Sequence, residues 1–567
     1  MKLSDTRPAL RAFNPAVLVF ALPCVLIIPN IVLDITDYSN WLEKIANVIL
    51  PFGLYLWLIG LSRNTGRSTL LMFPFIFYAA FQVVLLYLYG ESIIAVDMFL
   101  NVVTTNVGEA TELLGNLSLA IMTVIILYLT PLIWAVVLIW RKQKAPASTT
   151  AIARKYGAIC MAFGFLAMIA AYIFLPTYSA FRDVFPANVV NNTITAAIRT
   201  EKTHNYPKTS ANFDFKASSN RASELKEVYV LIIGETSRAD NWQLLGYERA
   251  TNPLLSQQDS LLIFSKALSQ SNTTHKSVPL LLTCTTPATF GDSIYSTKSI
   301  ITAFKQVGYS TAFFSNQARN HSFIDFFAEE ADSTIFIRDD GQHHKDAELL
   351  PMFRKFITSH DTEKLFIVLH TYGSHFNYKD RFEPEHAVFT PYNKAAASAE
   401  NRAELINAYD NTIVMTDALI DQVISTLKQL HCPAAMIYLS DHGEDIFDDC
   451  RGRFLHASPV PTYYQIHVPL ILWMSPELNT IDNSFYVNAG CHQNNNIASN
   501  DVVFHSIMQL AGITSAYSDS TRSIISQYYI DRPRVYLNDY NEATPLKYSG
   551  LRNYDFDRLS QKQISAD

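Results

Sequence analysis

The sequence predicts two domains of different class, an N-terminal bundle of five membrane-spanning helices and a C-terminal α/β domain with a mostly parallel sheet. Two observations support this division. The 567 residues are 49% hydrophobic and only 17% charged, and the apolar excess is concentrated in the first third of the chain. From residue 226 onward, strand-like apolar runs alternate with helix-compatible segments, a pattern typical of a parallel sheet covered by helices on both faces.

Five apolar runs near the N-terminus are long enough, or nearly so, to cross a hydrocarbon core about 30 Å thick. We predict them at 15–33, 46–61, 69–89, 117–140 and 156–176. Lys and Arg gather before the first run, between the second and third, and between the fourth and fifth, whereas the other two loops are acidic. Because short basic loops stay in the cytoplasm, we expect the N-terminus inside and the chain after about residue 177 outside. A cleaved signal peptide is the alternative for the first run, although no small-residue cleavage site is obvious near its end.

The acidic loop between the third and fourth runs contains a helix-compatible segment near 95–115. Asn101, Thr105 and Glu109 recur on it at four-residue steps and therefore share one face. Such a helix would lie in the membrane interface rather than cross the bilayer. From the residues alone, this stripe is either the solvated face of a connecting helix or a lipid headgroup site in which Glu109 meets a cation such as an ammonium.

The chain between the two domains, 177–225, is predicted as a linker. It is polar and is interrupted by Pro186 and Pro207, so we expect irregular structure with some short helix. Residues 226–567 then form the predicted catalytic domain. The net charge of −7, without a concentrated basic face, argues against a nucleic-acid-binding protein.

Metal-ligating side chains follow two of the strand-like runs. The run VYVLIIG is followed by Glu235, and the run AAMIYLS is followed by Asp441 and His442. Because the carboxyl ends of parallel strands meet at one edge of a sheet, we expect these side chains to lie close together. Glu, Asp and His together form a ligand set for a divalent metal ion.

A candidate nucleophile lies in the segment SQSNTTHKSVPLLLT. Thr273 and Thr274 precede a run that can begin a helix, where a hydroxyl would face helix-terminal amides. A free threonine hydroxyl is a poor nucleophile, but coordination to a divalent metal lowers its pKa. A Thr pair at this position is otherwise a helix cap, and these residues alone do not decide between the two roles.

Two histidines are expected to converge on the same site. His375 lies in HTYGSH after a strand end, and His456 lies in RFLHASP shortly after the second metal-ligating segment. His370 precedes the same turn as His375 and could belong either to the core or to the surroundings of the site.

One long motif runs from Gly234 onward as GETSRADNWQLLGYERATNP. Together with THKSVP, GSH, SDHGE and LHASP in this order, it resembles the signature of the phosphoethanolamine transferases. These are inner-membrane enzymes of Gram-negative bacteria in the alkaline-phosphatase-like superfamily, and they include lipid A modifiers and the mobile colistin-resistance enzymes. Their five-span anchor is also similar, so the resemblance covers nearly the whole chain. It implies a sulfatase-like catalytic domain on the periplasmic side.

The resemblance also implies roles for single residues. One catalytic zinc would be held by four ligands, namely Glu235, Thr274, Asp441 and His442. Thr274 would transiently carry the phosphoethanolamine, because the family's nucleophile stands three residues before the Ser of its S-V-P element, here Ser277. His375 and His456 match histidines that contact the transferred phosphate or a second metal. Mn²⁺ is as compatible with these ligand types as Zn²⁺.

The implied reaction transfers phosphoethanolamine from phosphatidylethanolamine to lipid A, a core sugar of lipopolysaccharide or another periplasmic glycan. The family has a substrate-binding triplet with the same spacing as Asn101, Thr105 and Glu109. We also expect the protein to be a monomer. The alternatives are a glycerophosphotransferase of the lipoteichoic acid type and a noncatalytic membrane sensor that retains the fold. A sulfatase would need a Cys or Ser in a C/S-x-P-x-R element, which THKSVP cannot supply.

The chain departs from the family in two respects. Gln270 and Leu280 stand where the lipid A enzymes carry cysteines that flank the nucleophile segment. Four cysteines lie outside the predicted spans and could form at most two disulfides, namely Cys284, Cys432, Cys450 and Cys491. The family's basic residue after the strand STAFFS is not clearly matched, and Arg319 or His321 stands nearby instead.

Overall fold

The computed structural model describes residues 13–36, 40–90, 92–104, 117–175, 178–360, 363–393 and 397–567. Side chains are described outside 101–104. The chain forms two compact units. One comprises 1–99 and 113–197, and the other comprises 100–112 and 198–567.

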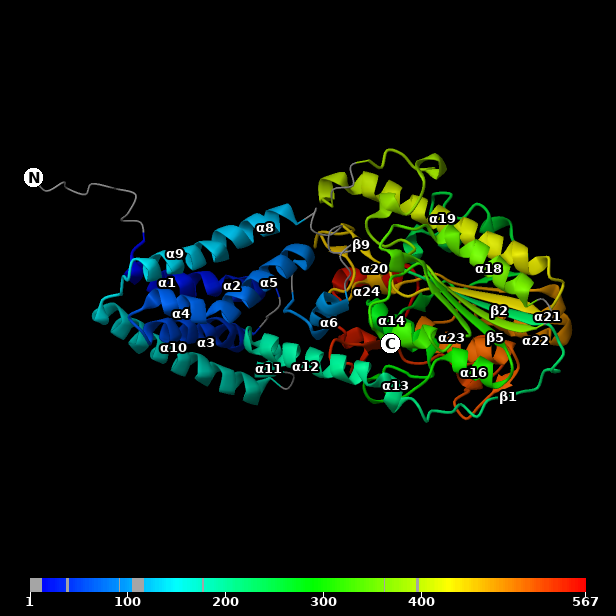
Figure 1. The fold of residues 1–567 in the computed structure, drawn as a ribbon, viewed down its shortest axis with the longest axis horizontal. Helices are drawn as coiled ribbons and strands as arrows, with labels where there is room; N and C mark the ends of the chain where they lie inside the picture. The colour runs from blue at the N-terminus through cyan, green and yellow to red at the C-terminus, as the bar shows by residue number, and fades with distance from the viewer. Residues whose placement is uncertain are drawn as a thin grey trace, which may run out of the picture. The chain divides into compact units, whose positions relative to one another are not determined.

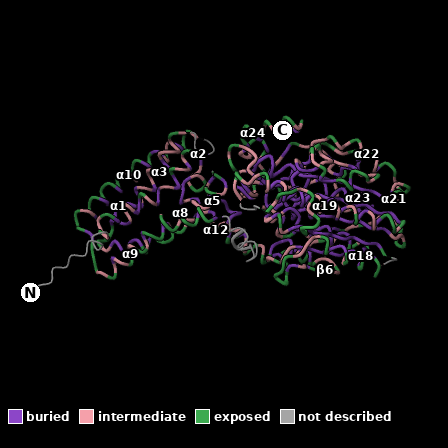
Figure 2. Tube along the Cα trace, turned by 90° about the horizontal axis from the view of Figure 1, so that it is seen from above, coloured by how far each residue is buried: buried purple, intermediate pink, exposed green. Residues whose placement is uncertain are grey.

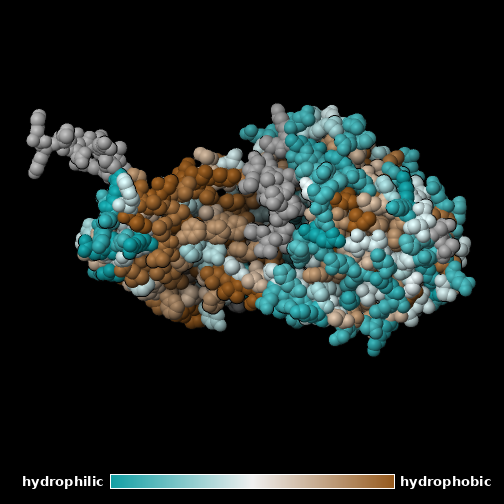
Figure 3. Space-filling view, in the orientation of Figure 1, coloured by the Kyte–Doolittle hydropathy of each residue, from teal (hydrophilic) through white to brown (hydrophobic). Residues whose placement is uncertain are grey.

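The first unit is helical (Figure 1). Its helices are α1 (Pro15–Leu26), α2 (Ile28–Thr36), α3 (Trp41–Gly60), α4 (Thr65–Leu71), α5 (Phe73–Tyr89), α6 (Val96–Thr104, which continues past this unit), α8 (Ser118–Val124), α9 (Thr130–Trp140) and α10 (Ala147–Phe174). Among the described residues, four helical segments are long and apolar enough to span a membrane. The pair α4 and α5, bent by 58°, forms either a fifth, broken span or a re-entrant loop. These agree with the predicted apolar runs. Figure 3 shows apolar residues over much of the visible surface of this unit, as expected for helices facing lipid.

Small residues allow α3 and α10 to pack closely. A Cβ atom added to Gly53 would lie 2.6 Å from the backbone nitrogen of Met161, and one added to Gly157 would lie 2.7 Å from that of Trp57. Close backbone approach through glycines is typical of helices that associate in membranes, where no hydrophobic driving force brings them together.

Residues 178–225, predicted as a linker, contain three helices. These are α11 (Ala180–Asp183), α12 (Ala187–His204) and α13 (Tyr206–Thr209). The two prolines that suggested irregular structure lie at their ends: Pro186 directly precedes α12, and Pro207 lies in the first turn of α13. Proline is well tolerated at these positions because the first helical N–H groups have no intrahelical partner.

The second unit is built on a seven-stranded sheet with the order β3-β11-β8-β2-β7-β5-β6. Its strands are β2 (Glu227–Gly234), β3 (Leu261–Ile263), β5 (Ser310–Ser315), β6 (Ser333–Phe336), β7 (Lys364–His370), β8 (Ala434–Ser440) and β11 (Leu470–Met474). Neighbouring strands are parallel from β8 to β6, whereas β11 pairs antiparallel with both β8 and β3. The predicted mostly parallel sheet is confirmed.

Helices cover both faces of this sheet (Figure 1). One face carries α14 (Thr274–Leu282), α16 (Ile300–Gln306), α17 (Phe323–Ala328) and α23 (Ser499–Leu510), and the other carries α18 (Leu349–Ser359) and α19 (Arg402–Lys428). Successive residues of β2 alternate between the two cores, Tyr229 facing one and Val230 the other. Figure 2 shows the resulting buried interior. A strand buried on both faces reads as a continuous apolar run, which explains VYVLIIG.

A buried ion pair closes the end of the sheet opposite the strand ends that carry the predicted ligands. Glu227 begins β2 and Lys364 begins β7, and Lys364 Nζ lies 3.1 Å from Glu227 Oε1. The hydroxyls of Tyr229 and Tyr309 donate to the same carboxylate at 3.0 and 2.6 Å. The charge of Glu227 is therefore neutralised and hydrogen-bonded, as a buried charge requires.

Replacement of Lys364 by Met should remove the nearer of two cations from the buried Glu227 carboxylate and leave Arg221 Nε, 3.9 Å from Glu227 Oε2. The stability of this unit should fall by about 3 kcal/mol. The matched control is Lys305→Met, because Lys305 pairs with Asp332 at 2.8 Å while both side chains are more than a third exposed. That surface pair should contribute less than about 1 kcal/mol. Thermal unfolding of the full chain, monitored by tryptophan fluorescence, measures the stability change in both variants. Equal midpoints for the two variants would contradict the account.

Candidate metal centre

The predicted metal ligands meet at the carboxyl end of the sheet. Glu235 follows β2, Asp441 and His442 follow the adjacent strand β8, and Thr274 is the first residue of α14. Thr274 Oγ1 lies 3.2 and 3.3 Å from the two carboxylate oxygens of Glu235 and 3.1 Å from His442 Nε2. His442 Nε2 in turn lies 3.4 Å from Glu235 Oε1 and 3.3 Å from Asp441 Oδ2. Ligand atoms from three distant segments thus surround one point.

The donor set fits a cation. His442 Nδ1–H donates to the carbonyl oxygen of Gly443 at 2.9 Å, so Nε2 offers its lone pair to the site. Asp441 Oδ1 accepts backbone N–H groups, but Oδ2 is buried and has no hydrogen-bond donor among the described residues. Lone pairs of Nε2, Asp441 and Glu235 therefore face one another. A divalent ion held by Glu235, Asp441, His442 and Thr274 would satisfy them.

Burial shifts the pKa values of these groups toward their neutral forms. It raises the pKa of Glu235 to about 8, with a further contribution from the charge of Asp441, and raises that of Asp441 to about 7. Burial, followed by the neighbouring His456, lowers the pKa of His442 to about 4. A cation site is expected to show this pattern when the positive charge of the cation is left out, because carboxylates then resist ionisation beside a neutral imidazole.

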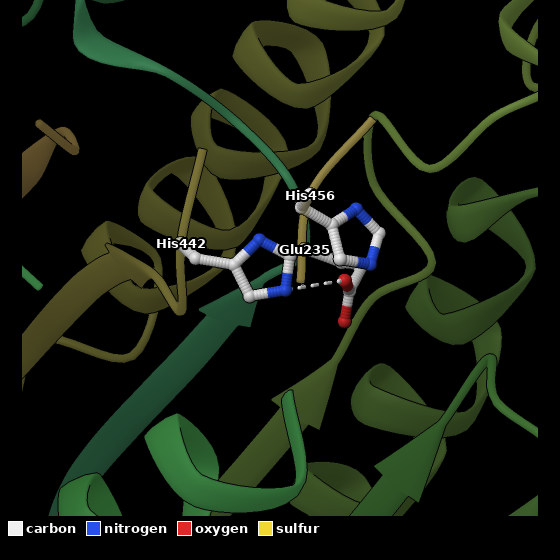
Figure 4. Close-up of side chains that lie close together, drawn as sticks. All are labelled: Glu235, His442 and His456. Carbon is white, nitrogen blue, oxygen red and sulfur yellow. Dashed lines mark ion pairs between the residues drawn. The ribbon is translucent and has the colours of Figure 1, made fainter. Parts of the chain in front are cut away.

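His456 lies at the edge of the same site. Its ring centroid is 4.3 Å from that of His442, and one ligand atom each of Glu235, His442 and His456 lie within 4.8 Å of one another. Figure 4 shows these three side chains converging. His456 Nδ1 contacts Glu444 Oε2 at 3.1 Å. This contact orients the ring, so that Nε2 points away from Glu444. Glu444 lies in SDHGE but was given no role from the sequence, because this contact depends on the fold of the following loop.

His375 completes the group of predicted residues. Its ring centroid lies 5.5 Å from that of His456, and its Nδ1–H donates to the carbonyl oxygen of Phe376 at 2.7 Å. Together with Thr274 and His456 it lines a cavity of about 140 Å³. The structure therefore brings together all the site residues that were predicted between 226 and 567.

The remaining predictions have different outcomes. The side chain of Asn101, and the whole of Thr105 and Glu109, lie outside the described residues. None of the six cysteines forms a disulfide in the described structure. Of the two basic candidates after β5, Arg319 pairs with Asp339, and neither it nor His321 lines the cavity; Asn320 between them does.

Most of the long motif around Glu235 supports the site rather than forming it. Arg238 donates to Asp448 Oδ2 and to Asn241 Oδ1, each at 2.6 Å, and Asn241 donates to Asp410 at 2.6 Å. The backbone N–H of Ser237 donates to Ser440 Oγ at 2.8 Å. These bonds tie the loop after β2 to the loop after β8 and to α19.

Close packing leaves no room for side chains at two turns. A Cβ atom on Gly373, whose φ is +52°, would lie 2.5 Å from the carbonyl oxygen of Glu235. A Cβ atom on Gly443 would lie 2.2 Å from the carbonyl oxygen of Tyr464. Both motif glycines therefore permit the approach of backbone segments that position the ligands.

A family model described as sulfatase matches residues 227–513. The chain belongs to the sulfatase family. It is similar to the putative transferase YhbX of Escherichia coli strain K12, with 31% identity over 256 residues that cover 44% of each chain. The match thus spans less than half the length of that relative. The phosphoethanolamine transferase EptA of the same strain is 25% identical over 503 residues, 85% of this chain and 88% of that protein.

Solved structures share the fold of this chain. The integral membrane lipooligosaccharide phosphoethanolamine transferase A of Neisseria meningitidis superimposes with a TM-score of 0.72 at 20% identity, over 90% of this chain and 97% of that one. The C-terminal periplasmic domain of EptC from Escherichia coli, in complex with Zn, superimposes with a TM-score of 0.51 at 23% identity, over 58% and 94%. The predicted fold class and family resemblance are confirmed.

The pKa shifts predict how the stability of the metal-free protein depends on pH. Between the ordinary carboxyl pKa of about 4 and the raised values, the folded state keeps protons that the unfolded state has released, so stability falls as pH rises. The lowered pKa of His442 has the opposite effect, but only below the ordinary histidine pKa of about 6.5. From about pH 6.5 to 8, the free energy of unfolding should therefore decrease.

Added Zn²⁺ should make this decrease smaller, because ligands that bind a cation have already released their protons. Burial also raises the pKa of Glu444 to about 8, and its part of the decrease should remain. The measurement is the thermal midpoint of chelator-treated and Zn²⁺-loaded full-length protein at several pH values in this window. Glu235→Gln, which cannot ionise at this position, is the matched variant and should show a shallower decline without metal. Identical pH dependence with and without Zn²⁺ would contradict the assignment.

Proposed function

We propose that this protein is a metal-dependent phosphoethanolamine transferase that acts at the periplasmic face of a bacterial inner membrane. The observation that carries the proposal is the position of Thr274 Oγ1, within 3.3 Å of both Glu235 and His442. A hydroxyl held among the ligand atoms of a cation site is placed to act as a nucleophile. The names of the relatives EptA and lipooligosaccharide phosphoethanolamine transferase A support the transferred group.

Zn²⁺ is the proposed ion, supported by the EptC domain described in complex with Zn. Glu235, Asp441, His442 and Thr274 would hold one ion, and His375 and His456 would contact the transferred phosphate or a second ion. When bound, the ion lowers the pKa of a coordinated hydroxyl and neutralises charge that develops on phosphoryl oxygens. The ligand types do not distinguish Zn²⁺ from Mn²⁺.

The donor in this proposal is phosphatidylethanolamine. Thr274 Oγ1 attacks the phosphorus, a new P–O bond forms at Thr274, and the bond to the diacylglycerol oxygen breaks. The proton of Thr274 Oγ1 would pass to His375 or His456, which line the cavity with Thr274, and the same histidine would then protonate the leaving diacylglycerol oxygen. Burial lowers the pKa of His456 to about 4, and an adjacent anionic phosphate group would favour its protonated form.

The second step transfers the group from Thr274 to the acceptor. An acceptor hydroxyl or phosphate oxygen attacks the phosphorus, a new P–O bond forms to the acceptor, and the bond to Thr274 Oγ1 breaks. The same histidine would accept the proton of an attacking hydroxyl and return it to Thr274 Oγ1; an attacking phosphate oxygen releases no proton, and Thr274 Oγ1 would then take one from water. We propose lipopolysaccharide as the acceptor, on its lipid A or a core sugar, because a matched structure is named for lipooligosaccharide. Another periplasmic glycan would satisfy the same chemistry. The charge distribution of the loops supports a cytoplasmic N-terminus, and the protein would act as a monomer.

The alternatives fit less well. Sulfatase activity would require a residue convertible to formylglycine, and the segment that begins at Thr274 reads THKSVP. A noncatalytic sensor would not need a hydroxyl among the ligand atoms. A glycerophosphotransferase shares this site chemistry and differs in the headgroup of its donor.

Replacement of Thr274 by Ala should abolish the covalent intermediate and reduce transfer at least about a thousandfold, because the hydroxyl that contacts both Glu235 and His442 is then lost. Thr274→Ser should retain the intermediate. Thr273→Ala is the matched control, since Thr273 Oγ1 contacts Ser271 Oγ at 3.2 Å and none of the proposed ligands in the described structure. The intact mass of the purified protein after incubation with phosphatidylethanolamine measures the intermediate. Full transfer by Thr274→Ala would remove Thr274 from the scheme.

The acceptor is identified by mass spectrometry of envelope glycolipids from cells with and without the protein. The molecule that gains one phosphoethanolamine in the presence of wild-type protein, and not of Thr274→Ala, is the acceptor. A gain of glycerophosphate instead would establish the glycerophosphotransferase alternative.

A further inference from the structure

The cavity beside Thr274 has a second wall that the proposed mechanism does not use. It includes Gln317 after β5, Ile324 and Asp325 of α17, Phe336 at the end of β6 and His370 at the end of β7. At about 140 Å³ the cavity is smaller than the pockets that hold drug-sized ligands. It would therefore enclose a headgroup rather than acyl chains.

Asp325 is the second carboxylate that lines this cavity, and it is not part of the cation site. It is only 4% exposed, and its Oδ2 accepts the backbone N–H groups of Asn320 and His321 at 3.0 and 2.6 Å. Its Oδ1 accepts no hydrogen bond from the described residues. Arg319, a cation in the adjacent loop, pairs with Asp339 instead. Buried carboxylates usually have a charged partner, and none of the described side chains forms an ion pair with Asp325.

His370 gives an independent indication that a ligand binds at this wall. It is 1% exposed, and its Nε2 has no hydrogen-bond partner among the described residues. Ser315 Oγ accepts the backbone N–H of Gln317 at 3.0 Å and lies 3.2 Å from His370 Nδ1, to which it can donate its own proton. With Ser315 Oγ as that donor, His370 carries its proton on Nε2, a hydrogen-bond donor without an acceptor among the described residues.

The wall thus combines a carboxylate, a free N–H donor and the apolar side chains of Ile324 and Phe336. This is the complement of a small zwitterion in which two methylene groups join an ammonium to a phosphate. We propose that Asp325 binds the ammonium of the transferred phosphoethanolamine, while Ile324 and Phe336 contact its methylene groups and His370 donates to a phosphoryl oxygen. This inference rests on the proposed function and makes Asp325 a determinant of donor specificity.

The environment of Asp325 is consistent with such a partner. Burial raises its pKa to about 6, against the lowering effect of the two backbone N–H groups and of His321 and Arg319. At neutral pH the Asp325 carboxylate is thus ionised, and its two backbone donors only partly offset the cost of burying its negative charge. An ammonium at Oδ1 would supply the missing charge.

The test compares two donors with the Zn²⁺-loaded full-length protein in lipid nanodiscs. Phosphatidylethanolamine carries the ammonium, and phosphatidylpropanol replaces it with a methyl group of similar size. Formation of the Thr274 intermediate is followed by intact mass. Wild-type protein should react about 10- to 100-fold faster with phosphatidylethanolamine. Asp325→Asn should lose this preference by slowing only the phosphatidylethanolamine reaction. The control Glu329→Gln changes an exposed carboxylate just after the same helix and should behave as wild type.

Three results would overturn the inference. They are equal rates of wild-type protein with the two donors, equal slowing of both donors by Asp325→Asn, and loss of the preference in Glu109→Gln but not in Asp325→Asn. The wild-type comparison does not depend on the folding of any variant. A wild-type protein that acquires no mass from either donor would refute the proposed function itself, and this inference with it.

Discussion

The site depends on one electrostatic constraint, the forced proximity of groups that repel one another. Glu235, Asp441 and His442 direct lone pairs at a common point, with His442 Nε2 only 3.3 and 3.4 Å from the two carboxylates. They cannot separate, because β2 and β8 are adjacent strands buried on both faces and backbone N–H groups hold Asp441 Oδ1. The core thus stabilises an arrangement that is unfavourable by itself. A cation relieves it, and Thr274 is the hydroxyl placed to share that cation's charge.

This constraint explains why the motif around Glu235 is so long. Only one of its residues is a proposed ligand, and the others resist the repulsion. Arg238, buried between the loops after β2 and β8, bonds Asp448 and Asn241, and its guanidinium carbon lies 5.5 and 5.2 Å from the ring centroids of Tyr409 and Tyr464. A charge with this many partners is costly to displace. Rigid support of this kind fixes ligand positions before a metal or substrate binds, which is what electrostatic preorganisation requires.

The sequence predicted best what depends on strand ends and chemical type. Glu235, Asp441 and His442 were expected together because parallel strands place their carboxyl ends at one edge, and the choice of Thr274 over Thr273 came from the family resemblance. The roles that the sequence did not predict depend on contacts between loops. Glu444 contacts His456 and Tyr378, the latter 66 residues away, and no local pattern announces such a bond. The length of helix α12 was not predicted, for another reason. Pro186 suggests a break in the segment, but it directly precedes the first residue of the helix.

The cavity holds two carboxylates whose surroundings suit different cations. Glu235 has Asp441 and His442 beside it, and a divalent ion needs several such converging donors to replace its water ligands. Asp325 has backbone N–H groups on one oxygen and apolar side chains beside it, so it offers a single negative charge with little further coordination. That environment would hold a metal ion poorly but would suit a monovalent ammonium, which needs one counter-charge and hydrogen-bond acceptors rather than a coordination shell. One cavity would thus bind the two ends of a zwitterionic group by separate electrostatic means, the phosphate at the metal centre and the ammonium at Asp325.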